Sequence, residues 1–303
     1  MKERNPLVSI ICDVFNHEQY IKDCLEGLVC QKTTFDYIIL IHDDASTDDS
    51  QVIIKEYIQK YPNLFLPIFQ KENQYSKGIS IWKTFQLTRA KTKYVAFCEG
   101  DDYWIDQYKL QKQVDFLEEH PNYSAVFGNI IVRDERLSPV IETPSDLHKH
   151  LFSIKDVLSG TVFPFASICV RDIVIEKCLN SEIKANGDML MSYYATSIGI
   201  VYMLDDYMSV YRKTGKGVCT SKTLKEQLIG ELSEWHSFHE QLHFPYPLTL
   251  VEHQSQKIFQ FCIKSNPKNL PIKRIIKEIR LCYLPIYITY ILIYGIKHVK
   301  HLL

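Results

Sequence analysis

The stretch YVAFCEGDDYWIDQYKL, residues 94–110, decides the fold because it joins a short apolar run to a cluster of carboxylates. Its first four residues are aromatic, β-branched or small and show no helical period, so they predict a buried parallel strand. Gly100 permits a sharp turn, and apolar residues then recur at helical spacing from Leu110 onward. Glu99, Asp101 and Asp102 are therefore expected at the carboxyl end of a strand, where open α/β sheets bind ligands.

Three carboxylates so close together repel one another unless a cation lies among them. Oxygen ligands suit Mg²⁺ and Mn²⁺, and Mg²⁺ is usually held by one or two carboxylates together with substrate phosphates. The acidic turn at residues 99–102 therefore favours a site for Mn²⁺ or Mg²⁺. The alternative is a solvated acidic turn that caps the following helix.

The composition argues against several classes of protein. The chain has 303 residues, enough for one large domain or two, and its 35 Lys and Arg balance 36 Asp and Glu. This balance argues against nucleic acid as a partner, because such binding depends on basic charge. The nine cysteines are scattered and include no CxxC pair, which is typical of reduced thiols in a cytosolic protein. No signal peptide precedes the first apolar run, so we expect the globular part to be cytoplasmic.

The first third of the chain alternates short apolar runs with helical patterns. Strands are expected over residues 7–14, 37–41, 65–69 and 94–97. Helices are expected after the first two strands, with Asn16 placed to cap one and Thr47 or Asp48 the other, and a further helix over residues 79–90. This order predicts an α/β fold with a mostly parallel sheet flanked by helices.

The second strand also ends in acids, in the sequence HDDASTDD at residues 42–49. Because the carboxyl ends of parallel strands lie at one edge of a sheet, Asp43 and Asp44 are expected to face the same cleft as residues 99–102. No GxGxxG follows the first strand and no GxxxxGK[ST] occurs, so the usual glycine-rich phosphate loops are absent. A nucleoside diphosphate bridged by a cation is therefore favoured over NAD or a kinase reaction.

Three motifs in this order resemble the family 2 glycosyltransferases, which are inverting enzymes with the Rossmann-like GT-A fold. They are VSII with FNHE at residues 8–11 and 15–18, HDDASTD at residues 42–48, and EGDDYW at residues 99–104. The resemblance covers roughly residues 6–215 and is nearest to bacterial transferases that build capsular, O-antigen or exopolysaccharide repeat units. It implies a catalytic GT-A domain over residues 1–215 and a C-terminal helical region over residues 216–303.

The resemblance also implies which residues bind the donor. Asp43 and Asp44 stand where the family contacts the nucleotide base, often uracil. The base pocket would be completed by Val14, Phe15 and Asn16, where Phe15 keeps the stacking face of the family's usual Tyr without its hydroxyl.

The acidic turn corresponds to the family's DxD-type segment. Asp101 and Asp102 would be the metal and diphosphate contacts, and Glu99 stands in place of the first Asp. Tyr103 and Trp104 adjoin these acids, so they are expected either to stack on a sugar or to pack beneath the loop.

The sequence YRKTGKG, residues 211–217, is similar to the family's flexible loop over the donor diphosphate. Arg212 and Lys216 would then offset phosphate charge. A plain basic turn is an equal alternative for Lys216.

Farther along the chain, Asn186-Gly187-Asp188 precedes an apolar helix over residues 189–198. It is similar to the family's acceptor-side motif, in which an Asp acts as general base. Inverting transfer needs such a group, because the acceptor hydroxyl must lose its proton as it attacks the anomeric carbon. Asp188 is the candidate, and the alternative for it is an ordinary helix cap.

The C-terminal region contains an uncharged stretch, LCYLPIYITYILIYGI, at residues 281–296. It is shorter than the roughly 20 residues that span a bilayer. Its tyrosines and the flanking cations suit a helix at residues 281–300 that lies at the inner face of the cell membrane. The alternatives are a helix packed on the catalytic domain and one in the interface of a homo-oligomer.

Taken together, these patterns predict a metal-dependent inverting glycosyltransferase of the hexosyltransferase type. It would move a sugar from a nucleotide-sugar donor, expected to be a UDP-sugar, to a glycan or a lipid-linked glycan in cell-surface polysaccharide biosynthesis. One alternative is a sugar nucleotidyltransferase, which normally needs a glycine-rich basic loop that FNHEQY, residues 15–20, does not supply. Another is a catalytically inactive nucleotide-sugar-binding protein, although the chain retains all the acids that catalysis needs.

Overall fold

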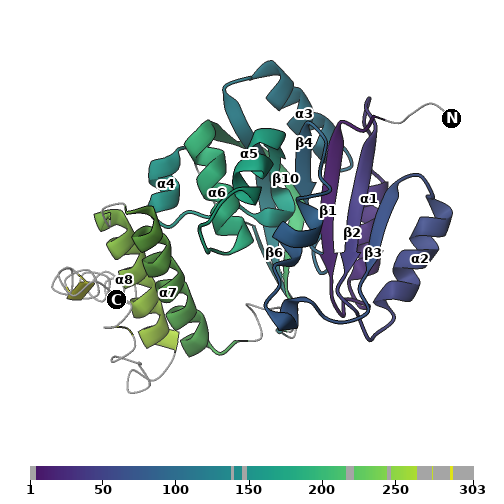
Figure 1. The fold of residues 1–303 in the computed structure, drawn as a ribbon. Helices are drawn as coiled ribbons and strands as arrows, with labels where there is room; N and C mark the ends of the chain where they lie inside the picture. Colours follow the sequence, from purple (N-terminus) through teal and green to yellow (C-terminus); the bar gives the residue numbers. More distant parts are fainter. Residues whose placement is uncertain are drawn as a thin grey trace. The chain divides into compact units, whose positions relative to one another are not determined.

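The structure, a computed structural model, describes residues 5–137, 140–144, 149–215, 222–243, 247–264, 275 and 287–288 (Figure 1). Two compact units divide the chain. The first comprises residues 1–153, 162–181 and 187–214, and the second comprises residues 154–161, 182–186 and 215–303. Residues 154–161 and 182–186, which precede the expected domain boundary in the sequence, thus belong to the second unit. The boundary expected at residue 215 stays a prediction.

Four parallel strands form the first half of the sheet in the first unit, in the spatial order β3-β2-β1-β4 (Figure 1). They are β1 (Val8–Val14), β2 (Tyr37–Asp43), β3 (Phe65–Phe69) and β4 (Tyr94–Phe97). Helix α1 (Ile21–Val29) follows β1, and helix α2 (Ser50–Lys60) follows β2. The expected strand–helix alternation and the parallel pairing of these strands are confirmed.

The second half of the sheet is mixed, with the order β9-β6-β10-β5 after β4. Strand β9 runs antiparallel to both β4 and β6, β10 runs parallel to β6, and β5 runs antiparallel to β10. Two short strands extend it, β7 on β6 and β8 on β10. The elements of this half are β5 (Tyr103–Trp104), α3 (Lys109–Glu119), β6 (Tyr123–Asp134), β7 (Ile141–Pro144), β8 (Leu151–Phe152), β9 (Cys169–Arg171), α5 (Asp172–Leu179), α6 (Gly187–Ile198) and β10 (Ile200–Lys213).

The described secondary structure of the second unit consists of helices. It contains α4 (Ile154–Leu158), α7 (Leu224–Leu242) and α8 (Leu248–Lys264). Thr223 and Glu226 form a capping box at the start of α7. Among the described residues, no helix combines the length and the apolar composition that crossing a bilayer requires. Apart from residues 287 and 288, the predicted membrane-contacting segment at residues 281–300 lies outside the described residues.

The core packs α1, α2 and α3 against one face of the sheet. Alternate residues of β1 and β2 enter this cluster, as the two-residue period of a strand requires. Helix α1 buries Ile21, Cys24, Leu25 and Leu28, which recur at helical spacing and form one apolar face.

Three local expectations are wrong. Asn16 does not cap α1, since Tyr20 holds the N-cap position and no side chain caps the helix there. Neither Thr47 nor Asp48 holds the N-cap position of α2, which belongs to Asp49, and no side chain caps that helix from there. Residues 79–90 do not form a regular helix but contain a π-helical turn, Trp82–Gln86.

The π-helical turn has a clear structural role. Gln86 is fully buried, and its side-chain Nε2 donates to the backbone oxygens of Cys12 and Leu40, at 3.2 and 3.0 Å. It thereby fastens this segment across β1 and β2. These contacts come from strands more than forty residues away along the chain, so the local apolar period did not reveal them.

Gly27 in α1 provides a test of this packing. A Cβ atom at residue 27 would lie 2.6 Å from the backbone oxygen of Trp104 and 2.9 Å from its nitrogen, so Gly27→Ala forces α1 away from β5. We expect this substitution to lower the free energy of unfolding by about 1–3 kcal/mol in urea titrations. In the control Gly230→Ala, the new methyl in α7 meets nothing within 4 Å, and stability should rise by about 0.5–1 kcal/mol. Equal stability of the two variants would contradict the close approach of α1 to β5.

Candidate active site

Two acidic segments meet at the end of β1. The backbone N–H of Asp44 donates to the Val14 oxygen at 2.9 Å, and the N–H of Gly100 donates to the Asp13 oxygen, also at 2.9 Å. The loops after β2 and β4 are therefore both fastened to the last two residues of β1. The expected convergence of the acids on one sheet edge follows directly from this pairing.

The acidic turn gathers three carboxylates. Ligand oxygens of Glu99, Asp101 and Asp102 all lie within 4.8 Å of one another. Burial and the charges of Asp101 and Glu99 raise the pKa of Asp102 well above its usual range. A set made only of carboxylate oxygens fits Mg²⁺ or Mn²⁺ better than a softer metal.

Glu99 belongs to the same electrostatic cluster. Loss of hydration raises the pKa of Glu99 to about 8, and the charges of Asp101, Asp13 and Asp188 add to this effect. Glu99 keeps exposed surface, so solvent moderates the repulsion there more than at Asp102, which is only 3% exposed. A cation at this turn would reduce the electrostatic repulsion at both Glu99 and Asp102.

Gly100 lets the turn lie close to β1. A Cβ atom there would be 2.7 Å from Nδ1 of His17 and 3.0 Å from Cγ2 of Val14. Val14 is therefore a packing partner of the acidic turn as well as a neighbour of the base-pocket segment.

Arg212 holds the acidic turn from the side of β10. Its backbone N–H donates to Oδ1 of Asp102 at 2.8 Å, and its Nη1 donates to the backbone oxygen of Asp101 at 3.1 Å. Its guanidinium forms an ion pair with Asp23 of α1 and lies 4.2 Å from the centre of the Tyr103 ring. Only 5% of Arg212 is exposed, whereas its ion-pair partner Asp23 is 58% exposed.

The first three residues of the segment expected to form a flexible loop, residues 211–217, belong to a strand instead. Tyr211, Arg212 and Lys213 belong to β10, where they pair with Val132, Arg133 and Asp134 of β6. Pairing in the sheet and the ion pairs of Arg212 stabilise this strand end. Lys216, the other predicted cation, lies outside the described residues.

Asp43 and Asp44 are both buried at the end of β2. Oδ1 of Asp43 accepts from the Ser46 N–H at 2.9 Å and from Gln51 Nε2 at 2.6 Å, while its Oδ2 has no hydrogen-bond partner within the described part of the chain. This buried, unpartnered oxygen suits a donor group on a ligand.

Asp44 positions a second aromatic residue near the base-pocket segment. Its carboxylate accepts from the N–H groups of Gln74 and Tyr75, at 2.8 and 3.0 Å. The side chains of Tyr75 and Phe15 are 57% and 41% exposed. Asp44 joins their two segments, because its carboxylate accepts from the Tyr75 N–H and its own N–H donates to Val14, the residue before Phe15. Sequence reasoning missed Tyr75, whose only signal was an aromatic residue in a polar loop.

Asn16 joins two loops. Its N–H donates to Oγ of Ser46 at 2.9 Å, and its Oδ1 accepts from the Thr47 N–H at 2.8 Å. Asn16 has a φ of 56°, a conformation that Asn tolerates better than most residues. In the structure described here its side chain therefore shapes the base-pocket loops.

Asp13 is a site residue that sequence reasoning missed. Its carboxylate accepts from Gln86 Nε2 at 2.6 Å. Burial raises the pKa of Asp13 to about 6, against the lowering effects of Gln86 and Arg89, and the charge of Asp44 raises it further. The only sequence signal was a single acid inside the otherwise apolar run IICDV.

Asp188 lies at the start of α6 and close to the acidic turn. Its Oδ1 accepts at 2.8 Å from the N–H of Met189, which is the next residue along the helix rather than the second or third as in an N-cap. Loss of hydration raises the pKa of Asp188, and its charge in turn raises the pKa of Glu99. The contact with Met189 uses one oxygen, so it does not exclude a catalytic role for the other.

An aromatic cluster supports the start of α6. A Cβ atom on Gly187 would lie 3.5 Å from the ring of Trp82, whose centre is 6.4 Å from that of Phe97 and 6.0 Å from that of Phe165. Trp82, which sequence reasoning also missed, belongs to the π-helical turn. π-Helical turns of this kind are frequent at functional sites.

Trp104 packs beneath the acidic turn. Its Nε1 donates to the backbone oxygen of Ala166 at 2.7 Å, and Nζ of the buried Lys109 lies 4.0 Å from its ring centre. Only 3% of the surface of Trp104 is exposed, which favours packing beneath the loop over stacking on a sugar.

Comparisons with known proteins agree with this geometry. Residues 9–173 match the family model described as Glycosyl transferase family 2. An uncharacterized protein of Mycobacterium tuberculosis is 33% identical over 216 residues, which cover 70% of this chain and 60% of that protein.

Two further proteins have names that describe an activity or a ligand. Escherichia coli WfaP, a UDP-Glc:alpha-D-GlcNAc-diphosphoundecaprenol beta-1,3-glucosyltransferase, is 30% identical over 171 residues, 56% of this chain and 61% of that protein. The match thus spans about three fifths of the length of these curated relatives. The solved structure of S. aureus TarS in complex with UDP-GlcNAc has a TM-score of 0.61 at 18% identity, over 93% of this chain and 79% of that one.

The environment of Asp13 gives a pH-dependent prediction. Its folded-state pKa of about 6 exceeds the ordinary value near 4, so its ionisation destabilises the folded chain. This cost is absent below about pH 4, grows as the pH rises, and is complete above about pH 6. Asp13→Asn keeps an acceptor for Gln86 and removes the cost.

Compared with the wild type, Asp13→Asn should gain about 1–3 kcal/mol of unfolding free energy between pH 4 and pH 7. Urea titrations at the two pH values, in the presence of a chelator, measure this difference. A pH dependence identical to that of the wild type would show that Asp13 is not a buried carboxyl.

Proposed function

This chain belongs to glycosyl transferase family 2, and we propose that it moves a sugar from a nucleotide-sugar donor to a hydroxyl of a glycan or lipid-linked glycan in bacterial polysaccharide biosynthesis. The observation that carries the proposal is the convergence of Asp43 and Asp44, the acidic turn and Asp188 at one edge of the sheet. These groups provide, in one place, a base-binding segment, oxygen ligands for a cation and a proton acceptor.

The donor is a UDP-sugar in this proposal. Asp43 offers its unpartnered Oδ2 to the base, and the exposed rings of Phe15 and Tyr75 offer stacking faces. Val14 and Asn16 complete the pocket by shaping its loops. The donor named for WfaP and the UDP-GlcNAc in the TarS structure support uridine as the base.

The diphosphate of the donor would lie over residues 99–102. Asp101 and Asp102 would hold Mn²⁺ or Mg²⁺, with Glu99 beside them. When bound, such an ion supplies compensation for the negative charge of the departing diphosphate. Arg212 orients both ligands through Asp101 and Asp102, a contribution that outer-shell residues commonly make at metal sites.

Asp188 accepts the proton of the attacking hydroxyl. Its Oδ1 is occupied by the Met189 N–H, so Oδ2 is the oxygen that receives the proton. Partial loss of hydration raises the pKa of Asp188, which brings its basicity closer to what general-base catalysis needs near neutral pH. The residue keeps exposed surface, so a hydroxyl can reach it. The hydroxyl attacks from the face opposite the diphosphate, and the anomeric configuration is inverted.

The acceptor in this proposal is lipid-linked, and the enzyme works beside a membrane. The lipid diphosphate in the name of WfaP supports a lipid-linked acceptor, which would place the chain at the cytoplasmic face of the membrane. The uncharged stretch at residues 281–296 would then contact that membrane.

Asp188→Asn separates catalysis from donor binding. Asparagine keeps the Oδ1 acceptor for the Met189 N–H but cannot take a proton, so transfer should fall by about 10²–10⁴-fold. Binding of UDP with Mn²⁺, measured by calorimetry, should stay within about twofold of the wild type, because Asp188 is not among the groups proposed to hold the nucleotide.

Asp172→Asn is the matched control. Asp172 begins α5 in the same way, with its Oδ1 accepting from the next N–H at 2.8 Å, but it lies outside the proposed site. Its substitution should leave transfer unchanged. A similar loss of transfer in both variants, or a loss of UDP binding in Asp188→Asn, would rule out Asp188 as the base.

A further inference from the structure

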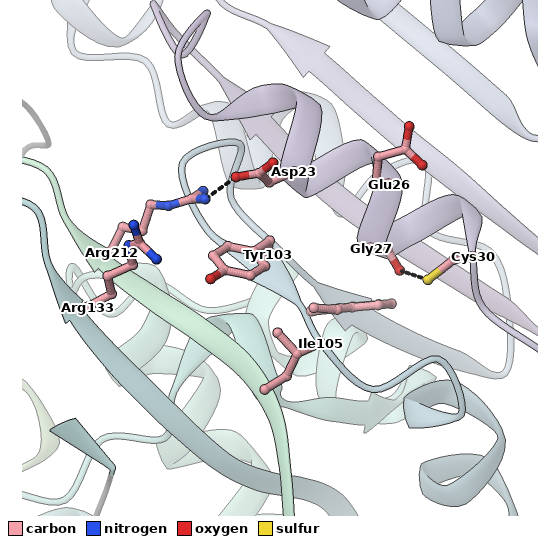
Figure 2. Close-up of a pocket in the computed structure, with 9 residues that line it drawn as sticks. Asp23, Glu26, Gly27, Cys30, Tyr103, Ile105, Arg133 and Arg212 are labelled. Carbon is pink, nitrogen blue, oxygen red and sulfur yellow. Dashed lines mark hydrogen bonds and ion pairs between the residues drawn. The ribbon is translucent and has the colours of Figure 1, made fainter. Parts of the chain in front are cut away.

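A second concave site lies between α1 and β5, with a cavity volume of about 500 Å³ (Figure 2). Helix α1 contributes Asp23 and Glu26, and Cys30 follows directly after it. Tyr103 and Ile105 come from β5 and the residue after it. The remaining wall consists of Arg133, Arg212, Gly27 and Trp104. Its size lies within the range of small-molecule pockets.

The charges of this pocket are balanced. Its lining contains two acids, Asp23 and Glu26, and two arginines, Arg133 and Arg212. Both arginines already form ion pairs: Arg212 with Asp23, and both with Glu135, at 2.7 Å for Arg133 and 3.4 Å for Arg212. A phosphate or another anion would therefore meet carboxylates rather than free positive charge, and a cation would meet the guanidinium groups.

A neutral sugar suits such a lining better than an ion does. Each sugar hydroxyl donates and accepts hydrogen bonds, so it can use a carboxylate and a guanidinium at once. Asp23 and Arg133 keep 58% and 34% of their side-chain surface exposed, so both are within reach of a ligand.

The pocket also has apolar faces for a ring. Tyr103 and Ile105 are two residues apart in an extended segment, so their side chains point to the same side of it, toward the pocket, as Figure 2 shows. Ile105 is 43% exposed, so its side chain is within reach of a ligand in the pocket. The C–H faces of a pyranose ring can pack on these two side chains.

We propose that this pocket binds a neutral pyranose unit of the acceptor glycan, away from the hydroxyl that receives the sugar. The proposal rests on the glycosyltransferase function proposed above. Arg212 links this pocket to the acidic turn, since its guanidinium faces the pocket while its Nη1 and backbone N–H hold Asp101 and Asp102. The glycan would thus be held beside the donor site without using its metal ligands.

Cys30 gives a direct probe of occupancy. It lines the pocket and is exposed, whereas Cys12, Cys24, Cys98, Cys169 and Cys178 are buried. The experiment measures the rate of N-ethylmaleimide addition to Cys30, read from the Cys30 peptide by mass spectrometry. The neutral probes are D-glucose, D-galactose and N-acetyl-D-glucosamine, D-glucuronate is the anionic probe, and UDP with Mn²⁺ tests the donor.

At least one neutral sugar should slow the alkylation of Cys30, by about twofold when its concentration equals its dissociation constant. In Ile105→Ala, which removes an apolar face, the protecting sugar should bind about tenfold more weakly. The control Ile173→Ala, at a 36% exposed isoleucine of α5 outside this pocket, should bind it as the wild type does.

Three results would overturn the proposal: no protection by any neutral sugar, equal protection by D-glucuronate, or protection by UDP with Mn²⁺. The alkylation assay requires no sugar transfer. A chain that binds no nucleotide while a neutral sugar still protects Cys30 would therefore contradict the proposed transferase function and leave the sugar-binding pocket standing.

Discussion

Carboxylates crowd together beside the end of β1, and accommodating their charge constrains the surrounding structure. Asp13, Glu99, Asp102 and Asp188 have raised pKa values, and in each the loss of hydration is the largest cause. Asp102 is only 3% exposed, and a buried charge costs free energy unless it is paired. Clustered carboxylates with raised pKa values are typical of a functional site.

The protein meets this constraint with fixed donors. Gly100 N–H fastens the turn to β1, and the backbone and guanidinium of Arg212 bind Asp102 and the Asp101 oxygen. Arg212 belongs to β10, which directly follows α6 in the chain. The helix that contains Asp188 and the strand that holds the acidic turn are therefore consecutive elements. These donors offset only part of the charge, and a divalent cation would offset the remainder.

Sequence patterns predicted the parts of the fold that local chemistry determines. Short apolar runs located β1 to β4, and the parallel topology brought Asp43, Asp44 and the acidic turn to one edge without further information. The antiparallel insertion of β9 between β4 and β6 was not predictable, because it depends on pairing partners distant in sequence. The same reason explains the buried Gln86, the strand position of Arg212 and the role of Asn16.

The central claim is that the acidic edge binds a nucleoside diphosphate through a divalent cation. Calorimetric titration of UDP with and without Mn²⁺, on the wild type and on Asp102→Asn, tests it most directly. Asparagine at residue 102 can still accept from the Arg212 N–H, so the turn should keep its shape while losing a metal ligand. The account predicts Mn²⁺-dependent binding of UDP that weakens about tenfold or more in Asp102→Asn. Binding that ignores both Mn²⁺ and the substitution would contradict it.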